Sequence, residues 1–128
     1  DMVLSEKVFC TDVVQMEERG GYFREGDIFV HSSLSETQSL VIVDSLMVGV
    51  PVVAIEANGV RDVIKNGENG LLTKNSAESL AQGILKLLKD KKLRAKLARG
   101  ASESAKKYTI ETTSTTLEAV YKKVLEGN

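Results

Sequence analysis

The stretch SLSETQSLVIVDSLMVGVPVV, residues 33–53, decides the fold of this chain. An apolar run from Leu40 to Val48 follows polar and acidic residues and precedes Gly49 and Pro51. Polar residues favour the start of a helix, and glycine followed by proline favours its end, so the pattern predicts a helix over residues 37–48. The residues that follow, 51–55, are apolar and β-branched, and they predict a buried strand.

Similar short apolar runs occur on both sides of this stretch. Residues 7–11, 27–31 and 71–73 are rich in Val, Ile, Phe and Leu and are flanked by turn residues, which is typical of strands. Segments with helical periodicity separate them, and this alternation favours parallel strands joined by crossover helices. We therefore predict an α/β fold with a Rossmann-like parallel sheet flanked by helices.

The carboxy-terminal part of the chain has helical periodicity throughout. Asn75, with Glu78 three residues later, resembles a capping signature for a first helix. A second helix is indicated by Leu93, Leu97 and Ala101, and Thr109 is a suitable cap for a third. Apolar residues recur at helical spacing in that last helix: Leu117, Val120, Tyr121, Val124 and Leu125.

Length and composition favour one globular domain. The 128 residues are 42% hydrophobic and 27% charged, with a net charge of −1 that gives no reason to expect nucleic acid as a partner. The single cysteine, Cys10, lies in an apolar run, and we expect a buried free thiol in a reducing, cytoplasmic compartment. His31 is the only histidine, and we expect a structural role at a strand end instead of a metal site.

Two carboxylates mark the central stretch. Glu36 and Asp44 are eight residues apart, which on a helix corresponds to roughly 12 Å along the axis and about 80° around it. This separation excludes a close acid/base pair but suits two contacts on an elongated, hydroxyl-bearing ligand. The alternative is structural: Glu36 caps a helix, and Asp44 is a partly exposed polar residue. Asp44 favours the first interpretation, because an Asp within an apolar helix needs a partner.

Residues 27–73, DIFVHSSLSETQSLVIVDSLMVGVPVVAIEANGVRDVIKNGENGLLT, resemble the group 1 family of retaining glycosyltransferases with the GT-B fold. The carboxy-terminal domains of that family carry Ser-Glu-Thr-Phe/Gln-Gly-Leu, an acid eight residues after the first Glu, and then Gly-x-Pro-Val-Val-Ala. The likeness extends through the helical tail and back to KVFC near the start. The resemblance implies that residues 1–128 are part of a carboxy-terminal donor-binding domain, without the acceptor domain and the first strands.

The resemblance also implies a donor site for a nucleoside diphosphate sugar. Glu36 would hold hydroxyls of the donor hexose near the reacting carbon, as the catalytic residue, and Asp44 would bind the ribose hydroxyls. The backbone amides of Ser39, Leu40 and Val41 would stabilise the diphosphate at a helix amino terminus. The donor-binding set is completed by Gln38 and by Gly59, whose loop follows a strand and opens a helix, although a simple chain reversal explains that loop equally well. The resemblance implies no metal and no cofactor.

Three residues depart from the family pattern: Ser32 replaces Pro, Ser39 replaces Gly, and Asp44 replaces Glu. Because two of these positions belong to the implied donor site, a non-catalytic binding or interaction module is one alternative function. A GT-B enzyme of another class, such as an epimerase or a phosphorylase, is the other. The acceptor implied by the resemblance is a sugar or a lipid.

The parts expected to be missing, the first strands and the acceptor domain, lead to further expectations. A sheet that lacks its inner neighbours has an open edge, so we expect the isolated chain to self-associate and to carry no transferase activity alone. The last helix is expected to expose part of its apolar face.

Residues 84–107 contain nine basic and two acidic residues. A solvated charged face is the simpler interpretation, and peripheral contact with an anionic membrane is the alternative.

Overall fold

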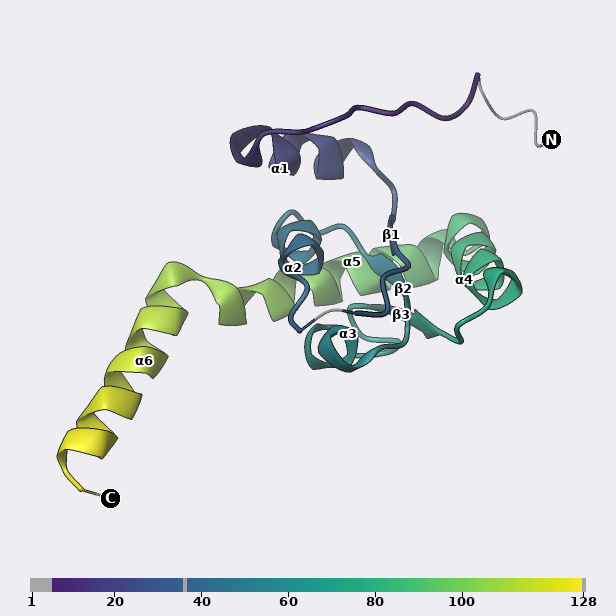
Figure 1. The fold of residues 1–128 in the computed structure, drawn as a ribbon. Helices are drawn as coiled ribbons and strands as arrows, with labels where there is room; N and C mark the ends of the chain where they lie inside the picture. Colours follow the sequence, from purple (N-terminus) through teal and green to yellow (C-terminus); the bar gives the residue numbers. More distant parts are fainter. Residues whose placement is uncertain (1–5, 36, 128) are drawn as a thin grey trace.

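The computed structural model describes residues 6–35 and 37–127. These residues form, in chain order, α1 (Met16–Glu25), β1 (Phe29–His31), α2 (Leu40–Met47), β2 (Val52–Ile55), α3 (Asn58–Val63), β3 (Gly70–Thr73), α4 (Ala77–Lys89), α5 (Lys91–Ala105), the short 3-10 helix η1 (Lys106–Tyr108) and α6 (Ile110–Leu125) (Figure 1).

The three strands form one parallel sheet in the order β1-β2-β3. Phe29 of β1 lies opposite Val52 of β2, and Val52 lies opposite Gly70 of β3. All four residues of β2 are buried, as expected for a central strand covered on both faces. The predicted α/β architecture is therefore confirmed, with the strands predicted at 27–31, 51–55 and 71–73 found at slightly different bounds.

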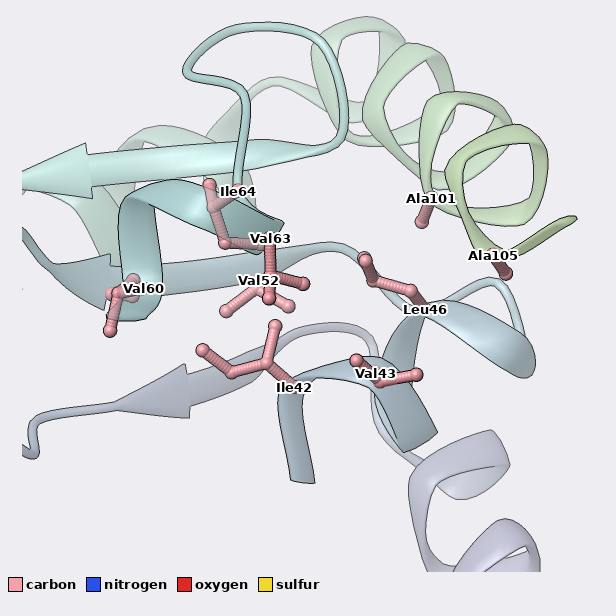
Figure 2. Packing of buried hydrophobic residues seen from close by; sticks show 10 residues of the cluster. Ile42, Val43, Leu46, Val52, Val60, Val63, Ile64, Ala101 and Ala105 are labelled. Atoms are coloured by element: carbon pink, nitrogen blue, oxygen red, sulfur yellow. The ribbon is translucent and has the colours of Figure 1, made fainter. Parts of the chain in front are cut away.

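Two apolar clusters cover the two faces of the sheet. Figure 2 shows the larger one, in which side chains of α2, β2, α3 and α5 meet; its buried members are Ile42, Val43, Leu46, Val52, Ala54, Val60, Val63, Ile64, Ala101 and Ala105. The smaller cluster joins β2, β3, α4 and α5 through Val53, Leu71, Leu87 and Leu97. Alternate residues of β2 enter different clusters because successive side chains of a strand point to opposite faces. Helix α5 contributes to both.

Helix α2 forms as the sequence predicts but is shorter. Its first residue is Leu40, with Ser39 at the N-cap, and its last is Met47. Gly49 follows with φ of +79°, a left-handed conformation that a residue with a side chain rarely adopts. The Ser45 hydroxyl donates to the Val50 carbonyl oxygen at 3.0 Å and ties the helix to the turn before β2. The chain thus turns directly from the end of α2 into β2.

Two sequence predictions on the amino-terminal side are wrong. Residues 7–11 form no strand, and Cys10 is exposed instead of buried. The neighbouring Val8 and Phe9 are 57% and 86% exposed. A strand needs a partner that supplies backbone hydrogen bonds, and the described residues place none beside this segment. No strand therefore pairs with the outer side of β1, which is an open edge of the sheet within the described part of the chain.

The carboxy-terminal helices follow the prediction more closely. The predicted cap Asn75 is wrong by one position, because the Ser76 hydroxyl caps α4 by accepting from the Ser79 amide at 3.1 Å. Thr109 caps α6 as predicted, accepting from the Thr112 amide at 3.2 Å. Helix α6 extends away from the rest of the chain and has no buried residue (Figure 1), so its predicted exposure is confirmed and extends to the whole helix.

Candidate functional site

An open cavity lies at the carboxyl ends of β1 and β2, where ligands bind in open α/β sheets. Its volume is about 530 Å³. One wall is the loop after β1, and the other is the segment from the end of β2 into α3; the lining residues are Leu34, Ser35, Thr37, Glu56, Ala57, Asn58 and Arg61. The parallel strands place these two walls side by side, because the carboxyl ends of neighbouring parallel strands meet at one sheet edge.

Arg61 and Glu56 are the charged residues among those that line this cavity. The Arg61 Nε atom lies 3.1 Å from Glu56 Oε1, and the two side chains are 58% and 47% exposed. Glu56 directly follows β2, and Arg61 lies one helical turn into α3. The cavity therefore offers a guanidinium that is oriented by a carboxylate and is still open to solvent.

The start of α2 lies next to the loop that walls this cavity. Ser39 is the N-cap residue, and Leu40 and Val41 are the first two helical residues, so their N–H groups have no acceptor within the helix. The Ser39 carbonyl oxygen accepts from the amides of Ile42 and Val43 at 3.1 and 3.2 Å. Gln38 is exposed just before the helix. The structure thus places these predicted donor-binding residues together at a helix amino terminus.

The side chain of Ser39 is unusual for an N-cap serine. The residue is 1% exposed, its hydroxyl makes no capping hydrogen bond, and its Oγ atom has no hydrogen-bond partner. Capping serines normally accept from an amide in the first turn. A buried hydroxyl without a partner costs free energy, about 1–3 kcal/mol in proteins. The hydroxyl that replaces the family glycine is therefore buried within the protein in this conformation.

Asp44 lies one turn further along α2, on the side that faces α1. Its Oδ2 atom lies 3.8 Å from Nη1 of Arg19, and both side chains are partly exposed. The partner expected for an Asp in an apolar helix is therefore Arg19. Asp44 and Arg19 line a cavity of about 270 Å³, whereas Arg19 and Val41 also line a neighbouring cavity of about 300 Å³.

Glu36 and Gly59 are the two remaining predicted site residues. Glu36 lies outside the described residues. Gly59 is buried in the first turn of α3, and its neighbour Asn58 is the residue that lines the 530 Å³ cavity. The loop after β2 therefore reaches the predicted sheet edge.

Sequence reasoning missed Arg61, Glu56 and Arg19. The first two could have been found from their position, because residues just after a parallel strand gather at the ligand-binding edge of the sheet. Arg19 carries no such signal. It lies in α1, and only the packing of α1 against α2 brings it to Asp44.

Outside this region, His31 is buried at the end of β1, as expected for a structural residue. The described residues contain no group of His, Cys, Asp and Glu suited to a metal ion. None of the helices in the described residues combines the length and apolar character needed to cross a bilayer.

The amino edge of the sheet carries a second polar cavity. Its volume is about 360 Å³, and Arg24, Lys91 and Arg94 are among its lining residues. Arg94 pairs with Asp27 at 3.1 Å. Membrane contact by the basic segment 84–107 stays a prediction.

Comparison with known proteins connects this geometry to a family. The sequence profile described as "Glycosyl transferases group 1" matches residues 2–104. The chain is 32% identical over 125 residues to D-inositol 3-phosphate glycosyltransferase of Acidothermus cellulolyticus, covering 98% of this chain and 28% of that protein. The first three curated relatives are matched over 20%, 28% and 31% of their own length, so the chain spans less than a third of each.

Solved structures agree with this match. The C-terminal domain of a group 1 glycosyl transferase from Francisella tularensis has a TM-score of 0.71 at 28% identity, covering 80% of this chain and 53% of that one. Anabaena HepE, solved in complex with UDP, has a TM-score of 0.71 at 27% identity over 79% of this chain and 29% of that one. With a parallel α/β sheet, a matching profile and these neighbours, the chain belongs to the group 1 glycosyltransferase family of GT-B proteins.

Proposed function

We propose that this chain is the donor-binding part of a retaining glycosyltransferase, which transfers a hexose from a nucleoside diphosphate sugar to an acceptor hydroxyl. The observation that supports this most is the 530 Å³ cavity at the carboxyl edge of the sheet, adjacent to the start of α2. The chain's membership of the family and its likeness to HepE, which has been solved with UDP and with UDP-glucose, support the same ligand class.

The donor would lie across the start of α2. Its diphosphate would accept hydrogen bonds from the amides of Ser39, Leu40 and Val41, where the positive end of the helix dipole favours negative charge. As the bond between the sugar and the phosphate breaks, negative charge grows on the leaving diphosphate, and these preorganised donors would stabilise it. Neither a metal nor a cofactor is part of this proposal.

The two ends of the donor would be held on opposite sides of that helix start. We propose that Glu36 binds hydroxyls of the hexose near the reacting carbon, and that Asp44 binds the ribose hydroxyls. The position of Asp44 beside the cavities lined by Arg19 and Val41 is consistent with a nucleoside on the α1 side of α2. The diphosphate would then lie where the 530 Å³ cavity meets the start of α2, and the sugar would extend from it into that cavity, near Gln38 and the Gly59 loop.

Nucleotide-binding calorimetry tests this division of roles. We expect Asp44→Ala to weaken binding of UDP by about tenfold to a hundredfold, the contribution of a hydrogen bond to a charged group. Glu36→Ala is expected to leave UDP affinity nearly unchanged and to reduce transfer in a full-length protein that contains this chain. Equal loss of UDP affinity in both variants would contradict the proposed roles.

Turnover assays of the full-length protein decide the reaction itself. A panel of nucleotide sugars would be offered with candidate acceptors, the products identified by mass and the anomeric configuration by NMR. Retention of configuration is the expected result. Formation of a free epimerised sugar, or a requirement for inorganic phosphate, would instead indicate an epimerase or a phosphorylase. Absence of nucleotide binding would favour a non-catalytic module.

A further inference from the structure

Arg61 is the cation that reaches the carboxyl-edge cavity from its α3 wall. Its side chain is 58% exposed, so its free N–H groups face solvent at the cavity instead of packing in the core. An arginine guanidinium has five N–H donors, and its contact with Glu56 joins Nε to Oε1 at 3.1 Å. Because the side chain is more than half exposed and one carboxylate cannot engage all five donors, Arg61 keeps N–H donors for a ligand.

Glu56 fixes the orientation of this guanidinium without enclosing it. Glu56 directly follows β2, and its amide donates to the Thr73 carbonyl oxygen at 2.9 Å, while Arg61 lies in α3, so both residues are held on the same wall of the cavity. A guanidinium whose Nε is fixed presents its terminal nitrogens as a planar fork, which matches the oxygens of a phosphate.

We propose that Arg61 is a donor-binding residue that contacts the diphosphate of the donor, with Glu56 as its positioning residue. The inference rests on the proposed function and adds to it a charged contact from the α3 wall, opposite the amides at the start of α2. The phosphate would then be held between neutral backbone donors on one side and a cation on the other. Arg61 would thereby neutralise charge on the leaving group, which the backbone amides alone only partly offset.

The test measures binding of two probes to the 128-residue chain by calorimetry: inorganic pyrophosphate, which reports the anion site alone, and UDP. We expect Arg61→Ala to weaken both by about tenfold. Arg61→Lys keeps the charge but not the fork, so an intermediate loss is expected. Glu56→Gln keeps an acceptor for Nε and removes a negative charge, so pyrophosphate should bind about twofold to threefold more tightly.

Two control variants complete the design. Arg99→Ala removes the same charge from an exposed position on α5, and binding of both probes should stay within about twofold of the unmodified chain. Arg94→Ala breaks an ion pair of the same 3.1 Å length at the opposite edge of the sheet. Thermal unfolding of every variant checks that its fold is retained.

The outcomes distinguish the proposed role of Arg61 from the proposed function of the chain. Equal affinities for Arg61→Ala and Arg99→Ala, or no binding of pyrophosphate to the unmodified chain, would overturn the role of Arg61. Loss of pyrophosphate binding in Arg94→Ala alone would place the anion site at the amino edge and would also overturn it. Binding of pyrophosphate through Arg61 without any binding of UDP would contradict the proposed function while leaving the anion site itself.

Discussion

Helices α5 and α6 are nearly equal in length, at 15 and 16 residues, but their environments are opposite. Helix α5 buries Leu97, Ala101 and Ala105 against the sheet layers. Helix α6 carries larger apolar side chains, yet none is buried, and Leu125 is 85% exposed. Apolar periodicity therefore predicts that a helix forms but does not predict what it packs against.

The two helices differ because α5 packs closely against neighbouring backbone and α6 does not. Gly100 of α5 lies so near the loop before β3 that an added Cβ would overlap the Glu68 carbonyl oxygen. The Asn69 side-chain amide donates to the Ser104 hydroxyl at 3.0 Å and joins this loop to the same helix. Small residues on α5 thus allow contact with the loop and sheet. Helix α6 has no comparable neighbour among the described residues.

The largest difference between the two helices is expected for leucine truncation. Leu97→Ala should lower the free energy of unfolding by about 3 kcal/mol, because it leaves a cavity in a fully buried cluster. Leu117→Ala in α6 should change it by less than about 0.5 kcal/mol, since Leu117 is 51% exposed. Chemical denaturation measures both. Similar losses would mean that α6 packs against the rest of the chain in solution.

A smaller effect is expected from a methyl group on α5. Gly100→Ala should destabilise the chain by about 2 kcal/mol, because backbone must shift to admit the Cβ. Gly21→Ala is the matched control: it lies in α1 with nothing within 4 Å of an added Cβ, and it should stabilise by up to about 1 kcal/mol through helix propensity. Thermal unfolding of the two variants would show opposite shifts. A neutral Gly100→Ala would refute the close approach of α5 to the loop.

The predicted self-association of the isolated chain tests whether the exposed apolar face of α6 has a partner in solution. Val120 and Val124 are 53% and 69% exposed on this helix. If its apolar face joins two copies, Val120→Ser with Val124→Ser should raise the dimer dissociation constant at least about tenfold in sedimentation experiments. Thr115→Ser with Ala119→Ser is the control on another face. An unchanged dimer would point to the open edge of β1, and a monomeric unmodified chain would refute the prediction.

These helices also indicate which parts of the fold can be predicted from local sequence signals. Local signals sufficed where partners are close in sequence: the turn at Gly49 and the cap at Thr109 are where the residues predict them. The strand predicted at 7–11 failed because a strand is completed by its neighbours, and an apolar run alone cannot supply them. The same reason explains why Cys10 is exposed.

The candidate site likewise contains residues that the sequence predicted and residues that only packing brings to it. The helix was predicted because periodicity is a local property, although it begins at Leu40 instead of residue 37. The placement of Ser39, Leu40 and Val41 at its amino terminus was implied by the family resemblance. Arg61 and Arg19 were not predicted, since each reaches the site from a different helix through packing. For Ser39, local sequence signals do not predict the burial of its hydroxyl, because that burial depends on how the surrounding elements pack.

The smallest expected effect lies at the junction between α5 and α6. Tyr108 packs against the larger cluster, and burial, followed by the negative charge of Asp62, raises the pKa of its phenol above the ordinary value. A raised pKa in the fold means that the neutral phenol is favoured there. Its contribution to stability is therefore complete below the unfolded pKa of about 10 and is lost as the pH rises above it.

Tyr108→Phe removes this titration, so its free energy of unfolding should fall less between pH 8 and pH 11 than that of the unmodified chain. Tyr121→Phe, at a residue of α6 that is 61% exposed, should leave the pH dependence as it was. Denaturant unfolding at the two pH values measures the difference among the three proteins. An equal fall in Tyr108→Phe and the unmodified chain would mean that Tyr108 is as open to solvent as Tyr121, and that the burial typical of α5 ends before the junction.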